Sequence, residues 1–261
     1  MVRSLSLSLV SVGLMAGSLL AQGPGRHMGG PGDFAMVRAE FGMTNKVVQG
    51  APYSAQAVTQ FTQTLANGDH ISRTTTASIA RDSQGRTRTE RPFGAIGALS
   101  AGQTARSTVM IFDPVAAKSY VLDATSHTAR SMPIRASRLA AGSSATPRTR
   151  PARNLANVKT EDLGTQVIQG LTAQGKRVTR TIPAGAEGNE KEIDIVTETW
   201  YSPDLQTIVM SKTSDPRYGD SVYQLTGVNR AEPDPTLFVV PSDYTVKEGR
   251  GMHRGPAPVA Q

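Results

Sequence analysis

The sequence predicts a mainly β protein, an antiparallel meander that forms a curved sheet or an incomplete (half) barrel, with few short helices and disordered tails. Two observations predict it. Segments rich in Val, Ile and Thr are separated throughout by Gly, Pro, Asn or Asp, the residues that tight turns require. No long segment carries a convincing apolar stripe at helical spacing. Short successive strands joined by tight turns pair with their neighbours, which favours an antiparallel meander.

Residues 1–21 have the pattern of a secretory signal peptide. Arg3 precedes an apolar run from about Leu5 to Leu20, and the small residue Ala21 follows it. A membrane anchor is the alternative, but the run is short and interrupted by Ser and Gly. The chain has no cysteine, which excludes a lipid anchor on cysteine, disulfides and thiol catalysis. We therefore expect a periplasmic or secreted protein.

Three segments are too rich in Gly, Pro, Ala, Ser or Arg to bury a core, namely 22–43, 135–160 and 248–261. The first and last are predicted to be disordered tails, and the middle one a basic flexible loop. The sequence thus predicts a single β domain over 44–247 that this loop interrupts. It leaves open whether the strands before and after the loop belong to one sheet.

The first block of strands begins with VTQFTQTL and HISRTTTASIARD, which flank Asn67-Gly68, a dipeptide typical of tight hairpins. The spacing of Val58, Phe61 and Leu65 also fits a helix, but the density of β-branched residues favours a strand. RTRTER, TVMIFDP and KSYVLDA are the next predicted strands.

The second block contains TQVIQGLTAQG, KRVTRTIPAG, EIDIVTETWYS, QTIVMSKTSD and DSVYQLTGVNRAE, each predicted to be a strand. PDPTLFVVP is predicted to be a helical turn or a terminal packing segment. Pro203 and Pro216 preset φ for two turns between these strands. The neighbouring Asp204, Asp215 and Asp220 therefore have a role in turns, and we expect them at hairpin ends and not in a catalytic site.

Aromatic and methionine side chains on the predicted strands are the candidate ligand-binding residues. Trp200, the only tryptophan, either packs in the core or lines an apolar cavity, since a strand buries one face with or without a ligand. The predicted ligand-binding residues are Phe61, Phe112, Tyr120, Trp200 and Met210.

The sequence predicts no catalytic residues, no metal site and no cofactor. The four histidines have no second histidine at ligand spacing, and there is no G-x-S-x-G elbow, P-loop or strand followed by G-x-G-x-x-G. A hydrolase would require a convergent Ser/His/Asp or carboxylate set, which the sequence does not indicate. Replacing His70 or His127 by alanine should therefore leave the function intact. We therefore expect a protein that is not an enzyme.

The formal charge of +7 does not indicate a nucleic-acid binder. Between Asp123 and Glu161 there are seven basic residues and no acidic one, so this segment alone accounts for the net charge. Two interpretations of it remain. The loop binds an anionic envelope surface by charge attraction, or it is a solvated linker.

The segment TVMIFDPVAAKSYVLDATSHTARSMP resembles the outer-membrane lipoprotein carrier (LolA/LolB-like) superfamily, in which a strand ends in a Phe/Tyr-Asp-Pro turn. RDSQGRTRTER, WYSPDLQTIVMSKTSDPRYGD and RAEPDPTLFVVPSDYTV resemble an exported family of Acidobacteria-like bacteria over most of the folded chain. The first resemblance implies an incomplete antiparallel barrel around an apolar cavity that shelters acyl chains. The basic loop departs from that pattern.

Two functions are consistent with these features. The first is a non-enzymatic exported binding protein that holds a lipid, a lipoprotein acyl chain or another apolar ligand in a β half-barrel. The alternative is an envelope structural or protein-interaction module with a filled core and no ligand. A ligand-sized cavity separates the two, and the sequence does not determine the oligomeric state.

Overall fold

The computed structural model describes residues 47–93, 106–134 and 157–249. The predicted signal peptide and N-terminal tail lie outside these ranges, as do the C-terminal residues from 250 and the basic loop up to residue 156. Among the described residues, no helix combines the length and the apolar character needed to cross a membrane.

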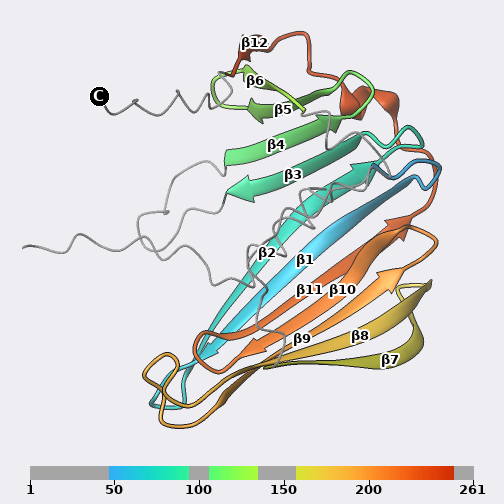
Figure 1. Cartoon of the computed structure of the whole chain (residues 1–261). Coiled ribbons are helices and arrows are strands. Elements are labelled where there is room, and N and C mark those ends of the chain that lie inside the picture. Colours follow the sequence, from blue (N-terminus) through green and yellow to red (C-terminus); the bar gives the residue numbers. More distant parts are fainter. Residues whose placement is uncertain (1–46, 94–105, 135–156, 250–261) are drawn as a thin grey trace, which may run out of the picture.

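The described strands form one twelve-stranded sheet (Figure 1). The first six are β1 (Tyr53–Thr64), β2 (His70–Arg81), β3 (Thr87–Phe93), β4 (Arg106–Asp113), β5 (Lys118–Asp123) and β6 (Thr128–Pro133). The later six are β7 (Val158–Ile168), β8 (Leu171–Ile182), β9 (Ile193–Ser202), β10 (Thr207–Asp215), β11 (Gly219–Asn229) and β12 (Thr245–Glu248). A 3₁₀ turn, η3 (Pro235–Phe238), lies where the sequence predicts a helical turn.

Strands β1 to β6 and β7 to β11 each follow one another in space as they do in sequence. The two runs meet where β1 pairs antiparallel with β11, with Ala57 opposite Leu225. Both blocks therefore belong to one sheet, which ends at β12 and β7 and does not close on itself. The predicted curved antiparallel meander is confirmed, and β12, which pairs parallel with β6, is the exception.

Three boundaries differ from the sequence prediction. β7 begins at Val158, so the last residues assigned to the basic loop belong to the sheet. Glu248, assigned to the C-terminal tail, lies in β12 because that strand finds a partner in β6. TQVIQGLTAQG is not one strand, because a turn at Gln169 and Gly170, both with positive φ, divides it. The next glycine, Gly175, lies inside a strand and not in a turn.

That following glycine, Gly175, lies inside β8 opposite Trp200 of β9. A Cβ at this position would stand 2.4 to 2.7 Å from three carbon atoms of the Trp200 ring, which is closer than real Cβ contacts. Glycine is therefore required by the indole that covers it, and not by a turn.

The face of the sheet that carries buried side chains changes from one group of strands to the next. In the central strands, Ala57, Ala77 and Leu225 share the face that carries Tyr223, which we name the Tyr223 face. In β4 to β6 the register places Ile111 and its packing partner Leu122 on the other face. The buried face therefore changes along the sheet, and Leu171, Ala173 and Trp200 of β8 and β9 are buried on the face opposite Tyr223.

The second cluster is covered by the segment that follows β11. Val240 and Tyr244 pack against it, and η3 contacts β3 and β4. The carboxylate of Glu232 accepts hydrogen bonds from the backbone N–H and the hydroxyl of Ser83 at 3.0 and 3.2 Å. The end of the domain is thus fastened back onto its first block.

Arg81 connects β2 to the turn between β9 and β10. Its guanidinium donates to the carbonyl of Ala51 at 2.7 and 3.0 Å and to the carbonyl of Leu205, and it lies 4.8 Å from the centre of the Tyr53 ring. The residue is only 5% exposed, and this burial lowers the pKa of Arg81. The hydrogen bonds to two carbonyls compensate for removing the cation from water.

Asp215 closes the turn between β10 and β11, as the sequence predicts. Its carboxylate accepts the backbone N–H of Arg217 at 3.0 Å and two guanidinium N–H groups at 2.9 and 2.7 Å. These hydrogen bonds from Arg217 lower the pKa of Asp215. A bidentate pair of this kind fixes the turn by charge as well as by geometry.

We predict that Gly175→Ala lowers the free energy of unfolding by about 1–3 kcal/mol, because the added methyl group displaces the Trp200 ring. Urea unfolding followed by Trp200 fluorescence measures both the stability and the environment of the ring. The neighbouring Gln174→Ala, at an exposed position, is the matched control. Unchanged stability and emission in Gly175→Ala would contradict the close packing.

We predict that Asp215 makes its full contribution to stability above about pH 3.8, its usual pKa. Its pKa is lower in the folded chain, so the contribution is lost as the pH falls from that value toward the folded pKa. Asp215→Asn should therefore lose less stability than the parent between pH 5 and pH 2.5, values chosen to bracket the titration. Acid unfolding curves test this, with the half-exposed Asp204→Asn as control; equal losses would refute the role of Asp215.

Candidate functional site

The candidate site lies on strands β7 to β10, on the face of the sheet opposite Tyr223, which we name the Trp200 face. The register aligns Gly175, Trp200 and Met210 in one row across β8, β9 and β10. Trp200 belongs to the buried core cluster that also contains Tyr223 and Val209, and Leu163, beside the bulge in β7, packs against that cluster. These residues make an apolar row on the Trp200 face.

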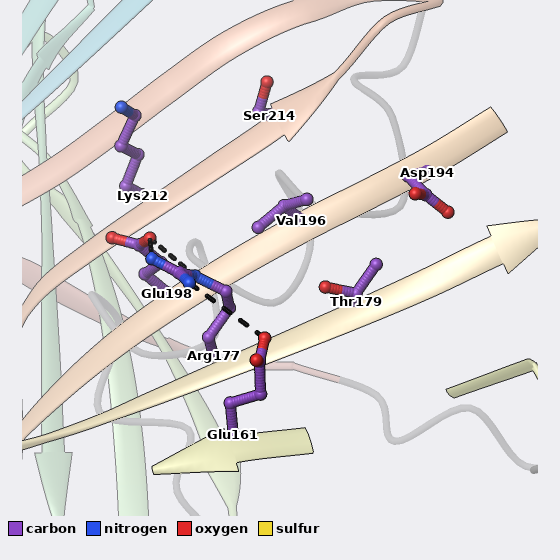
Figure 2. A pocket seen from close by; sticks show the side chains of 8 residues that line it. All are labelled: Glu161, Arg177, Thr179, Asp194, Val196, Glu198, Lys212 and Ser214. Carbon is purple, nitrogen blue, oxygen red and sulfur yellow. Dashed lines mark hydrogen bonds and ion pairs between the residues drawn. The ribbon is translucent and has the colours of Figure 1, made fainter. Parts of the chain in front are cut away.

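A charged row lies next to it on the same face, two residues further along each strand. Glu161, Arg177, Glu198 and Lys212 face one another in that order across β7, β8, β9 and β10. A hollow of about 440 Å³ opens over this row (Figure 2). Its lining residues are Glu161, Arg177, Thr179, Asp194, Val196, Glu198, Lys212 and Ser214.

Arg177 holds the charged row together. Its Nε and Nη2 donate to Oε1 of Glu198 at 2.9 and 2.7 Å, and Nη1 lies 4.0 Å from Oε2 of Glu161 (Figure 2). Lys159 pairs with the other oxygen of Glu161 at 3.0 Å. The guanidinium is thus neutralised by its neighbours and serves to order the row.

Lys212 differs from Arg177. It faces Glu198 across the β9–β10 ladder, yet it forms no ion pair with any residue in the described part of the chain. Its side chain is exposed at the edge of the hollow. An ammonium group in that position is available to an anionic group of a ligand.

The volume of the hollow is within the range of about 300–1,000 Å³ typical of ligand sites, but its lining is charged where such sites are mostly apolar. Its shape and chemistry fit one end of an amphipathic molecule, with the apolar row beside it available for the other end. Among residues 47–93, 106–134 and 157–249, no group of three or more His, Asp or Glu side chains is arranged to hold a metal ion.

The structure brings together two of the five predicted ligand-binding residues. Trp200 and Met210 are cross-strand partners in the apolar row. Phe61 lies on the Tyr223 face, opposite to them. Phe112 and Tyr120 lie in β4 and β5 and point to opposite faces of the sheet. None of the five lines the hollow, and a ligand contact by any of them stays a prediction.

The charged row was not predicted from the sequence. In EIDIVTETW the alternation that we used to predict a strand also places Asp194, Val196 and Glu198 on one face. The contribution of this strand to the hollow could therefore have been found from the sequence. Arg177 and Lys212 could be added only once the register of β8 and β10 was known, because register decides which residues of different strands face each other.

No protein-family model matches the chain, and a search of curated proteins finds no match. Solved structures show likeness of fold. A chain of the Pseudomonas aeruginosa MucA/MucB complex is 13% identical with a TM-score of 0.41, and the match covers 86% of this chain and 66% of that one. The chain spans 60–66% of the length of the three MucB-related chains matched.

Two further matches cover nearly all of the other protein. A LolA superfamily protein from Nitrosomonas europaea is 8% identical with a TM-score of 0.30, and the match covers 77% of this chain and 96% of that one. The Mycobacterium tuberculosis lipoprotein LppX is 15% identical with a TM-score of 0.29, and the match covers 78% and 98%. These low identities and TM-scores make each match a distant likeness of fold and no more.

We predict that Arg177→Ala lowers the free energy of unfolding by about 0.5–1 kcal/mol, because Glu161 and Glu198 then lose their shared cation at a partly exposed site. Lys212→Ala, which breaks no ion pair, should change stability by less than about 0.5 kcal/mol. Urea unfolding of both variants measures the difference. Equal effects would show that Arg177 does not order the row.

Proposed function

We propose that this protein is an exported, non-enzymatic binding protein that holds an amphipathic apolar molecule, such as a fatty acid or lipid acyl chain, on the Trp200 face. The observation that carries the proposal is the adjacency of the apolar row of Gly175, Trp200 and Met210 to the charged hollow. Acyl chains gain free energy by leaving water, and polar head groups need charged or polar partners. The two rows offer both within neighbouring cross-strand pairs.

The exposed ammonium of Lys212 supports a carboxylate or phosphate as the polar group. Arg177 is occupied by Glu198, so Lys212 is the cation of the hollow that a ligand can pair with. The acyl chain then lies along Met210 and Leu163, both partly exposed beside the buried ring of Trp200. An apolar molecule in an exported protein agrees with the predicted signal peptide and with the fold that the chain shares with LolA-like proteins.

The experiment uses Trp200 as a reporter, because it is the only tryptophan in the chain. We predict saturable quenching of its fluorescence by 9,10-dibromostearate, since bromine quenches only at short range. Unbrominated stearate should reverse the quenching by displacement. Met210→Glu should weaken binding by about tenfold or more, because it places a charge in the apolar row. Val167→Glu, at a position 72% exposed in β7, is the matched control.

A second comparison tests the head group. Lys212→Glu should weaken binding of the brominated acid and leave binding of its neutral methyl ester unchanged, because only the acid pairs with the ammonium. Absence of saturable quenching, or equal affinities of the Met210→Glu variant and the parent, would contradict the proposal. The result would then favour the alternative module with a filled core and no ligand.

A further inference from the structure

Strands β2 and β3 separate along part of their length. β2 pairs with β1 along all twelve of its residues, but with β3 only from Ser78 to Arg81. β3 pairs with β4 along all of its seven residues. The sheet therefore forks between β2 and β3, which diverge in Figure 1. Residues His70–Ala77 have no partner strand on the β3 side within the described chain.

Pro92 explains where the pairing ends. The last cross-strand pair joins Ser78 to Glu90, and continuing the register would place Pro92 opposite Thr76. Proline has no N–H to donate, and in antiparallel pairs alternate residues donate to the same neighbour. Pro92 stands at a position that would have to donate to β2. The ladder stops there, and no strand formed by the described residues continues it along the outer edge of β2.

The hydrogen bonds at the two ends of β2 show which of its backbone N–H and C=O groups point away from β1. Leu65 donates its N–H to the carbonyl of Asp69, and Asp82 donates to the carbonyl of Arg86 on the β3 side. The alternation between these points turns the N–H and C=O groups of even-numbered residues away from β1. The backbone groups that point into the fork are those of His70, Ser72, Thr74 and Thr76.

The two ends of the sheet are protected against further strands, whereas this edge is not. β7 carries a bulge between Asp162 and Gly164 and several charged residues, and β12 is only four residues long with Lys247 and Glu248. Bulges, charges and short length are the usual means of blocking an edge. The His70–Ala77 edge has no bulge, no proline and one charged residue that is ionised at neutral pH, Arg73.

We propose that the open edge His70–Ala77 binds an extended, acidic segment of a partner protein, which adds to the sheet as a strand beside β2. Ile71 and the three threonines of this stretch favour extended pairing, and all of these residues are exposed. Their support is rigid, because β1 holds β2 from one end to the other. This surface is separate from the hollow on β7 to β10.

Charge identifies the partner as acidic. Arg73 makes no ion pair within the described residues, and β1 beside it contains no charged side chain at all. The register places Arg73 on the Tyr223 face of β2. A strand with carboxylates on that face would lie beside this cation.

The test uses the purified protein and the capped octapeptide SEVEVEVS, whose glutamates all lie on one face of a strand. Residue-resolved hydrogen exchange should show slow exchange at the amides of His70, Ser72, Thr74 and Thr76 only when the peptide is present. Thr74→Pro removes one of these donors without touching the β1 ladder and should weaken peptide binding by about tenfold. Thr74→Ala keeps the N–H and should bind like the parent.

Charge reversal provides a second measurement if Thr74→Pro does not fold. Arg73→Glu should weaken SEVEVEVS and strengthen SKVKVKVS by comparable factors. Four results would overturn the proposal. Protection of these amides without peptide would mean that the chain covers its own edge, and protection that grows with protein concentration would mean that a second copy covers it. The other two results are protection at β7 or β12 instead of β2, and no protection by the peptide at any strand.

Discussion

The antiparallel pairing of β1 with β11 is the contact on which the rest of the structure depends. Eight residue pairs join the block that ends at β6 to the block that begins at β7. Without them the sheet would split into two smaller sheets with two additional edges, one at β1 and one at β11, and no common core. β1 is suited to this central place because it has no charged residue and carries alanines at 55 and 57, which let Tyr53, Tyr223 and Leu225 pack closely.

Register converts that sheet into surfaces with different chemistry. On the Trp200 face, a shift of two residues along four strands separates the apolar row of Trp200 and Met210 from the charged row of Arg177 and Lys212. The Trp200 indole can lie this close to the sheet only because Gly175 has no Cβ. The register shifts in β7 and β10 lie beside this row, and bulges of this kind bend the strands that carry them.

The fork between β2 and β3 follows from one property of the backbone, the missing N–H of Pro92. Pro92 cannot donate to β2, and the sheet opens where its donor is missing. A sheet that buries the Tyr223 face in its centre and the Trp200 face around Ile111 also has to change its packing near this place. Thr89 of β3 is still buried on the Tyr223 face, so the change of core lies beyond the fork, between β3 and β4.

The sequence by itself determined the strand-rich meander, the turns at Asn67-Gly68, Pro203 and Asp215, and the turn at η3, because these follow from local propensity and backbone chemistry. Tertiary structure alone decided that both blocks share a sheet and that Gly175 lies under Trp200. It also decided that Arg177 and Lys212 share a row. These depend on register between strands far apart in sequence, and an alternating pattern is compatible with many registers.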